Sequence, residues 1–127
     1  MRVLVACEFS GVVRDAFLAK GHDAISCDLE ESERPGPHYR GDVRDLLKGG
    51  FDLMIAFPPC THLSKAGAHV WKHKAVEQRE ALDFVWELMT ADIPKIAIEN
   101  PAGKINTAIG KPSQIVHPWM FGHPWTK

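Results

Sequence analysis

A cysteine preceded by two prolines is the most chemically suggestive feature of the sequence. The segment Pro58-Pro59-Cys60 follows Phe51–Ala56, an apolar stretch that is typical of a buried strand. The prolines stiffen the chain and so place Cys60 just beyond that strand. A thiolate there could add to an electron-poor ring carbon. We therefore predict that Cys60 is a nucleophile, and that Cys7 and Cys27, which lie within apolar segments, are inert buried side chains.

A carboxyl group closes a second apolar segment. Lys95–Glu99 predicts a strand, and Glu99 is followed by Asn100 and Pro101. Burial raises the pKa of a carboxyl group, which would make Glu99 a proton donor at neutral pH. An acid that only caps the next turn is the alternative. Because Cys60 is expected at a neighbouring strand end, we favour a pair of acid and thiol.

Two further acids indicate a nucleoside site. Asp28 lies 17 residues after Gly11, close to the ~20 expected of an acid that binds ribose hydroxyls. Asp42 could accept a hydrogen bond from the exocyclic amine of adenine, although each acid alone is equally compatible with a cap. The glycine turn has neither a lysine nor further glycines beside it, as a phosphate cradle would. A nucleoside without phosphates therefore fits better, and S-adenosylmethionine is the obvious candidate.

The elements that must position these residues alternate between strands and helices. We expect strands at Arg2–Cys7, Ala24–Cys27, Tyr39–Val43, Phe51–Ala56 and Lys95–Glu99. One helix is expected to start at a Ser10 cap, and a second is expected over 75–89 with an apolar face made of Leu82, Val85, Trp86 and Met89. This alternation predicts an α/β fold with a mostly parallel sheet and helices on both faces. Ligands bind such sheets at the carboxyl ends of the strands.

Composition and charge exclude several classes of protein. The chain has 127 residues, 45% of them hydrophobic and 24% charged, which are values of one ordinary globular domain. It contains no apolar run near the ~20 residues of a bilayer span, so we expect no membrane association and a cytoplasmic location. The net charge of −1 excludes a general polycation. Three cysteines without a C-x-x-C pair suggest neither a disulfide framework nor a zinc knuckle.

The segment after Cys60 is basic and contains several histidines. Cys60, His62, His69 and His73 could be interpreted as a metal site. Lysines and a tryptophan interleave with them, however, and a basic loop with one aromatic residue is more typical of contacts to nucleic-acid phosphates. We therefore expect no metal, and we expect this loop to contact a phosphate backbone.

Taken together, these motifs resemble those of the DNA (cytosine-5)-methyltransferase family, in particular its short phage-type members. Phe9-Ser10-Gly11 is similar to the family's cofactor loop, and Asp28 and Asp42 are similar to its ribose and adenine acids. Pro58-Pro59-Cys60 with Ser64 resembles its catalytic loop, and Glu99-Asn100 resembles its Glu-Asn motif.

The resemblance implies a Rossmann-like S-adenosylmethionine-dependent methyltransferase sheet and a role for each matching residue. Cys60 and Glu99 would be catalytic. The cofactor would be bound by Phe9, Ser10, Gly11, Asp28, Asp42 and Pro58, and the substrate by Pro59, Ser64, Lys65 and Asn100. The implied partner is DNA, with the target cytosine flipped out of the duplex. The implied location is the cytoplasm of a bacterium or of a phage-infected host cell.

Features that the family has and this chain lacks keep other interpretations open. Residues 1–127 are expected to form one catalytic and cofactor domain, irregular from about residue 105, with no target-recognition domain; a fragment of a longer protein is an alternative. Val13 replaces a family glycine, and no arginine follows Arg79. These departures favour a second hypothesis, a catalytically impaired module that binds cofactor or DNA in a regulatory role. An enzyme that modifies small pyrimidine nucleotides is a third. The apolar segment Trp119–Trp125 leaves a homo-oligomer open.

Overall fold

A computed structural model describes residues 1–59 and 75–100 of the chain. Residues 1–59 and 84–99 form one compact unit, and the remainder is assigned to a second. The first unit contains the whole sheet and is described by itself. The expectation that residues 1–127 make a single domain is not tested and stays a prediction.

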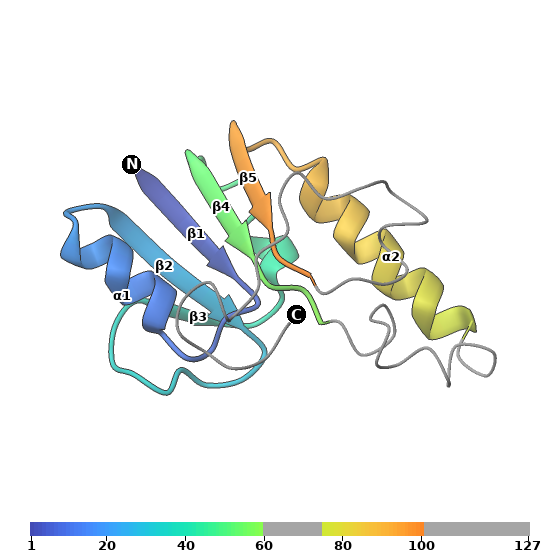
Figure 1. The fold of residues 1–127 in the computed structure, drawn as a ribbon, viewed down its shortest axis with the longest axis horizontal. Coiled ribbons are helices and arrows are strands. Elements are labelled where there is room, and N and C mark those ends of the chain that lie inside the picture. The colour runs from blue at the N-terminus through green and yellow to red at the C-terminus, as the bar shows by residue number, and fades with distance from the viewer. Residues whose placement is uncertain (60–74, 101–127) are drawn as a thin grey trace, which may run out of the picture. The chain divides into compact units, whose positions relative to one another are not determined.

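The sheet has five strands, all parallel, in the order β3-β2-β1-β4-β5 (Figure 1). The strands are β1 Arg2–Ala6, β2 Asp23–Asp28, β3 His38–Arg40, β4 Leu53–Ala56 and β5 Lys95–Ile98. Their register aligns the ends of the three central strands, because Ala6 pairs with Cys27 on one side and with Ala56 on the other. Ala56 in turn pairs with Ile98. The residues that follow β1, β2, β4 and β5 therefore lie along one edge of the sheet.

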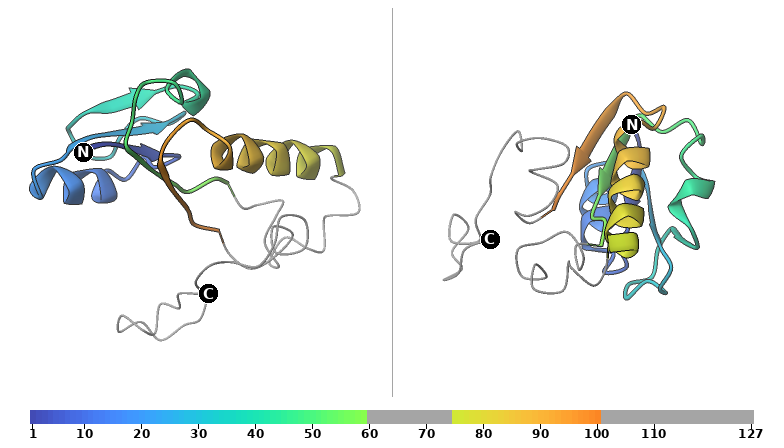
Figure 2. Two further views of the ribbon diagram at one scale, coloured as in Figure 1. Left: turned by 90° about the horizontal axis from the view of Figure 1, so that it is seen from above. Right: turned by 90° about the vertical axis from the view of Figure 1, so that its right-hand side faces the viewer.

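The central strand β1 is covered on both faces, as its unbroken apolar sequence predicts. Val3 and Val5 pack against α1, Val12–Ala19, through Val13, Phe17 and Leu18. Leu4 and Ala6 face the opposite way, into a cluster that contains Leu88 of α2, Ala75–Met89, and Val43 of the short 3₁₀ helix η1, Val43–Asp45. The four side chains from Val3 to Ala6 are fully buried. The left view of Figure 2 shows α1 on one side of the sheet and η1 on the other.

The fold class predicted from the sequence is confirmed at the level of a mixed α/β architecture with helices on both faces of a parallel sheet. The prediction of Ala75–Met89 as a helix is confirmed over its full range. The third predicted strand is shorter than expected, since β3 ends at Arg40 and the following residues form η1 instead. Asp42 begins η1 as its N-cap, which is the local alternative to strand pairing for a short acidic side chain.

Two local predictions about the helices are wrong. The N-cap of α1 is Gly11, at φ +81°, and not Ser10, although Ser10 Oγ accepts a hydrogen bond from Val12 N at 3.2 Å. In α2, Val85 and Leu88 are buried, whereas Trp86 and Met89 are exposed. The helix therefore presents a narrower apolar stripe to the sheet than its composition suggested. None of the helices in residues 1–59 and 75–100 combines the length and the apolar character that a membrane span requires.

Candidate functional site

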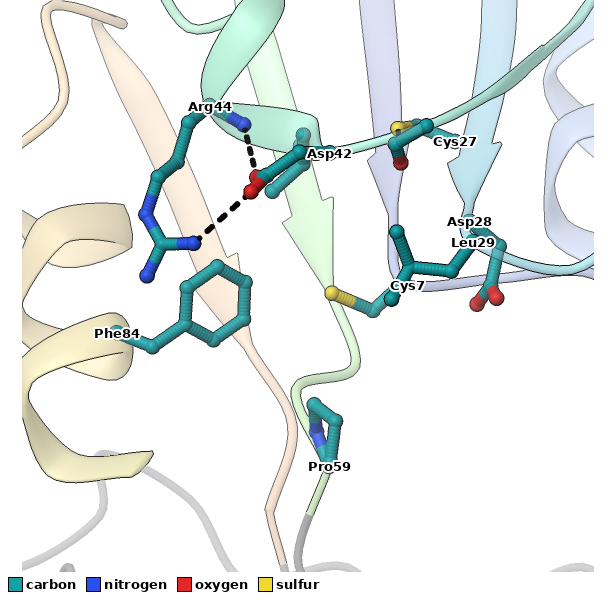
Figure 3. Close-up of a pocket in the computed structure, with 10 residues that line it drawn as sticks. Cys7, Cys27, Asp28, Leu29, Asp42, Arg44, Pro59 and Phe84 are labelled. Atoms are coloured by element: carbon teal, nitrogen blue, oxygen red, sulfur yellow. Dashed lines mark hydrogen bonds and ion pairs between the residues drawn. The ribbon is translucent and has the colours of Figure 1, made fainter. Parts of the chain in front are cut away.

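A pocket of about 240 Å³ opens at the carboxyl edge of the sheet, within the first unit (Figure 3). The chain segments that follow β1, β2, β3 and β4 supply most of its wall, and α2 supplies Phe84. Its lining residues are Cys7, Cys27, Asp28, Leu29, Gly41, Asp42, Val43, Arg44, Pro59 and Phe84. The pocket thus lies where ligands bind parallel sheets, and both acids predicted to bind a nucleoside are in its wall.

Asp28 and Asp42 occupy different parts of the pocket wall. Asp28 ends β2 and accepts a hydrogen bond from Glu30 N at 2.9 Å through Oδ1. Asp42 accepts from Arg44 N at 2.9 Å through Oδ1 and from the Arg44 guanidinium at 3.0 Å through Oδ2. The backbone N–H of Arg44 is the main reason that the pKa of Asp42 lies below its ordinary value. Asp42 is therefore a hydrogen-bond acceptor at neutral pH.

Arg44 and Phe84 complete the pocket and were missed by the sequence analysis. The Arg44 guanidinium lies over the Phe84 ring, with Cζ 4.7 Å from the ring centroid, and its Nε donates to Glu87 of α2 at 2.8 Å. Figure 3 shows Phe84 on the side of the pocket opposite Asp28 and Leu29. An aromatic ring facing a carboxylate acceptor suits a flat heterocycle that carries an amino group.

Cys7 is predicted to be an inert side chain within a strand, and the predicted position is wrong. Cys7 follows β1, at φ +59°, and is only half-buried in the pocket wall. Cys27 is fully buried in β2. Burial, reinforced by the nearby charge of Asp28, raises the pKa of each thiol to about 12. Both therefore stay protonated at neutral pH and are poor nucleophiles.

Alkylation should distinguish the three cysteines. In the native protein at pH 8, we expect iodoacetamide to modify Cys60 much faster than Cys7 or Cys27, because only the thiolate reacts and the pKa of the latter two is about 12. Time-resolved peptide mass spectrometry measures the three rates, and the same reaction in urea provides the control, in which the rates should converge. Equal rates for Cys7 and Cys60 in the native protein would contradict the expectation.

The loop after β1 contains a buried acid that sequence analysis did not single out. Glu8 is 7% exposed, and its Oε1 accepts a hydrogen bond from the Ser10 hydroxyl. Its second carboxylate oxygen is buried and has no hydrogen-bond partner among the described residues. Phe9, the next residue, is exposed and its carbonyl accepts from Glu33 N at 2.8 Å. A buried acceptor without a partner is costly, and a ligand with a donor group would satisfy it.

Gly11 is explained by the chain's own packing. A Cβ atom there would lie 2.8 Å from the Arg14 guanidinium and 3.0 Å from Arg34 Cβ, and the positive φ also favours glycine. Arg14 is fully buried and pairs with Asp15 at 2.9 Å. Its guanidinium also donates to Ser26 Oγ of β2 at 3.1 Å and to three oxygens of the segment that links β2 to β3, namely Ser32 Oγ, Arg34 O and Pro35 O, at 3.1–3.3 Å. A role of Gly11 in binding a cofactor stays a prediction.

Of the remaining predicted residues, the structure describes Pro58, Pro59, Glu99 and Asn100. Pro58 is buried and Pro59, beyond it, is exposed in the pocket wall. Glu99 N donates to Ala56 O at 3.0 Å, so the half-buried Glu99 lies beside the start of the Pro58-Pro59 segment. Asn100, also half-buried, follows it.

Several predictions concern residues that the structure does not describe. Cys60, Ser64 and Lys65 lie outside the described residues, as do His62, His69 and His73. Residues 1–59 and 75–100 contain no group of three or more His, Cys, Asp or Glu side chains that could hold a metal ion. The expectation of no metal is therefore untested for the histidine-rich segment.

Comparison with models of known protein families, with curated proteins and with solved structures gave no match to this chain.

Proposed function

We propose that the protein transfers a methyl group from S-adenosylmethionine to C5 of cytosine in DNA. The observation that carries this proposal is the hydrogen bond from Glu99 N to Ala56 O. It places Glu99 beside the residues that lead to Cys60, at the edge of the sheet where Asp28 and Asp42 line a pocket. A carboxyl group, the segment that leads to a cysteine and a pocket lined by two aspartates thus share one edge of the sheet.

The strand order supports a nucleoside-binding sheet. The order β3-β2-β1-β4-β5 matches the first five strands of the doubly wound Rossmann-like sheet, in which the ligand binds where the order reverses, between β1 and β4. Cys7, which follows β1, and Pro59, which follows β4, both line the pocket.

The chemistry of the pocket suits the nucleoside part of the cofactor. Its volume of about 240 Å³ is below the 300–1,000 Å³ typical of sites that enclose a drug-sized ligand, so it would hold adenosine and leave the methionine part outside. Asp28 would accept from ribose hydroxyls and Asp42 from the adenine amine. Glu8, with a buried carboxylate oxygen that lacks a partner among the described residues, has the right chemistry for the ammonium group of the methionine part.

In the proposed reaction the chain's own residues act on the cytosine ring. The Cys60 thiolate adds to C6, while Glu99 holds or protonates N3 and so stabilises the charge that enters the ring. S-adenosylmethionine, when bound, supplies the electrophilic methyl group for C5. Loss of the C5 proton and elimination of the Cys60 sulfur from C6 then restore the aromatic ring. The base must leave the duplex to reach these residues.

Replacement of Asp28 tests the cofactor site. Asp28→Ala should weaken the binding of S-adenosylmethionine by about 1–3 kcal/mol, because buried hydrogen-bonding groups of the ribose would lose their partner. Isothermal titration calorimetry measures the change. Asp23→Ala, at the exposed opposite end of the same strand, is the matched control and should leave the affinity unchanged. Equal affinities of wild type and Asp28→Ala would place the ribose elsewhere.

A further inference from the structure

We propose that Arg44 is a positioning residue that fixes Asp42 and Phe84 as a pair that recognises an amino-purine, so that selectivity for adenine over a purine without the amine depends on Arg44. The inference rests on the proposed function, because it assumes that an adenosine-type cofactor occupies the pocket. It concerns which residue makes the pocket selective.

One guanidinium connects the two sides of this part of the pocket. Arg44 NH1 donates to Asp42 Oδ2 at 3.0 Å, and its Nε donates to Glu87 Oε2 at 2.8 Å. The same side chain lies over the Phe84 ring, which belongs to α2. Figure 3 shows the Arg44 side chain directed toward both Asp42 and Phe84. Arg44 therefore links the acceptor on η1 to the aromatic ring on α2.

Both Asp42 oxygens are engaged by Arg44, yet the carboxylate keeps the capacity to accept from a ligand. Oδ1 receives the backbone N–H of Arg44 and Oδ2 receives its guanidinium. Each carboxylate oxygen has two acceptor sites, so one site on each oxygen remains for a base amine. Holding the carboxylate in one orientation before the ligand arrives lowers the entropy cost of binding. Arg44→Ala would keep the backbone hydrogen bond to Oδ1 but remove the guanidinium from Oδ2, so the carboxylate could turn about Oδ1 and a base amine would gain less from it.

These contacts contribute more to recognition than to stability. The exposed fractions are 44% for the Arg44 side chain and 46% for Asp42 and for Glu87. Ion pairs this exposed to water add little to the free energy of unfolding. Loss of Arg44 should therefore leave the fold intact while it changes how the pocket discriminates between bases.

The experiment compares the affinity for S-adenosylhomocysteine with that for S-inosylhomocysteine, which has a carbonyl oxygen in place of the exocyclic amine. The two ligands have the same charge, so a general electrostatic effect of removing Arg44 cancels in the ratio of their affinities. A lost hydrogen bond to a charged acceptor corresponds to roughly 10–100-fold. We expect wild type to prefer S-adenosylhomocysteine by that factor, and Arg44→Ala to reduce the preference to less than about threefold.

Arg2→Ala is the matched control. Like Arg44, Arg2 forms an exposed ion pair, with Asp23, and lies over an aromatic ring, with Cζ 4.8 Å from the centroid of Phe51. Arg2 lies at the start of β1, however, whereas the pocket lies at the carboxyl end of that strand. We expect Arg2→Ala to keep the wild-type preference. We also expect Arg44→Lys to show an intermediate preference, because lysine keeps the charge but not the two-sided contact. Thermal unfolding should shift by no more than about 5 °C in each variant.

A double-mutant cycle tests whether Arg44 changes the preference between the two ligands through Asp42. If Arg44 acts through Asp42, then Asp42→Ala alone abolishes the preference and Arg44→Ala adds nothing to it. An unchanged preference in folded Arg44→Ala, or an equal loss of affinity for both ligands, would overturn the inference while leaving the proposed function standing. Wild-type protein that binds neither ligand would instead overturn the proposed function.

Discussion

Cys60→Ala is expected to abolish methyl transfer to DNA while leaving the affinity for S-adenosylmethionine almost unchanged. The thiol forms the bond to the cytosine ring and has no role in holding the cofactor, so turnover and cofactor affinity should separate. The other two cysteines cannot substitute for it, because the pKa of both thiols is raised to about 12. Transfer of tritium from labelled cofactor to duplex DNA measures activity, and calorimetry measures affinity. Asp23→Ala, at the exposed start of β2 and away from the pocket, is the control and should keep activity.

Glu99→Gln tests the role of the Glu99 acid independently of the Cys60 thiol. Glutamine keeps the size of the side chain but offers no transferable proton, and general acid catalysis is typically worth ~10²–10⁴-fold. The variant should fold, because the backbone hydrogen bond from residue 99 to Ala56 is retained.

For the cysteine variant, methyl transfer by Cys60→Ala at the wild-type rate would show that the cytosine-5 mechanism is wrong for this chain.

Arg14→Ala is expected to lower the free energy of unfolding by about 2–5 kcal/mol, the range seen when a large, fully buried side chain is truncated to alanine. Arg14 is completely buried, and its guanidinium donates to Ser26 of β2 and to oxygens of the segment that joins β2 to β3. Without it, those oxygens would lose their donor and a cavity would remain. Since whole domains are stable by only about 5–15 kcal/mol, this is a large fraction of the total.

Urea denaturation measures the effect of Arg14→Ala, with Arg34→Ala as the control. Arg34 pairs with the same acid, Asp15, at 3.6 Å, but 52% of its side chain is exposed. Its removal should change the free energy of unfolding by less than about 1 kcal/mol. Similar unfolding midpoints for the two variants would show that the Arg14 network does not support the fold.

The sequence was sufficient to predict the sheet and the edge that carries the polar residues. The apolar run of β1 and the periodicity of α2 are local patterns, so their positions could be predicted without knowledge of the partners. Asp28 and Asp42 were found for the same reason, because Asp28 follows the predicted strand Ala24–Cys27 and Asp42 lies near the end of the predicted strand Tyr39–Val43, and both line the pocket.

The residues that the sequence did not predict depend on contacts between distant segments. Arg44 meets Glu87 across 43 positions of the chain, and no local pattern indicates that pairing. Arg14 is an arginine on a helix, and such residues are usually exposed. Gly36 is a residue of the sequence that reflects the burial of Arg14, because at φ +149° a Cβ atom there would lie 2.8 Å from the Arg14 guanidinium. Its meaning becomes apparent only once the segment between β2 and β3 is folded over α1.

The most direct test of the proposed function is covalent trapping on DNA that contains 5-fluorodeoxycytidine. Fluorine at C5 cannot depart as the proton does, so the bond between Cys60 and C6 would persist after methyl transfer. Mixed-sequence duplexes avoid the need to know a target site. After nuclease digestion, peptide mass spectrometry should find Cys60 linked to a methylated fluorocytosine nucleotide in wild type with S-adenosylmethionine, and no such product in Cys60→Ala. Wild-type protein that binds S-adenosylmethionine yet forms no adduct on these duplexes would contradict the proposed function and favour a module that only binds cofactor.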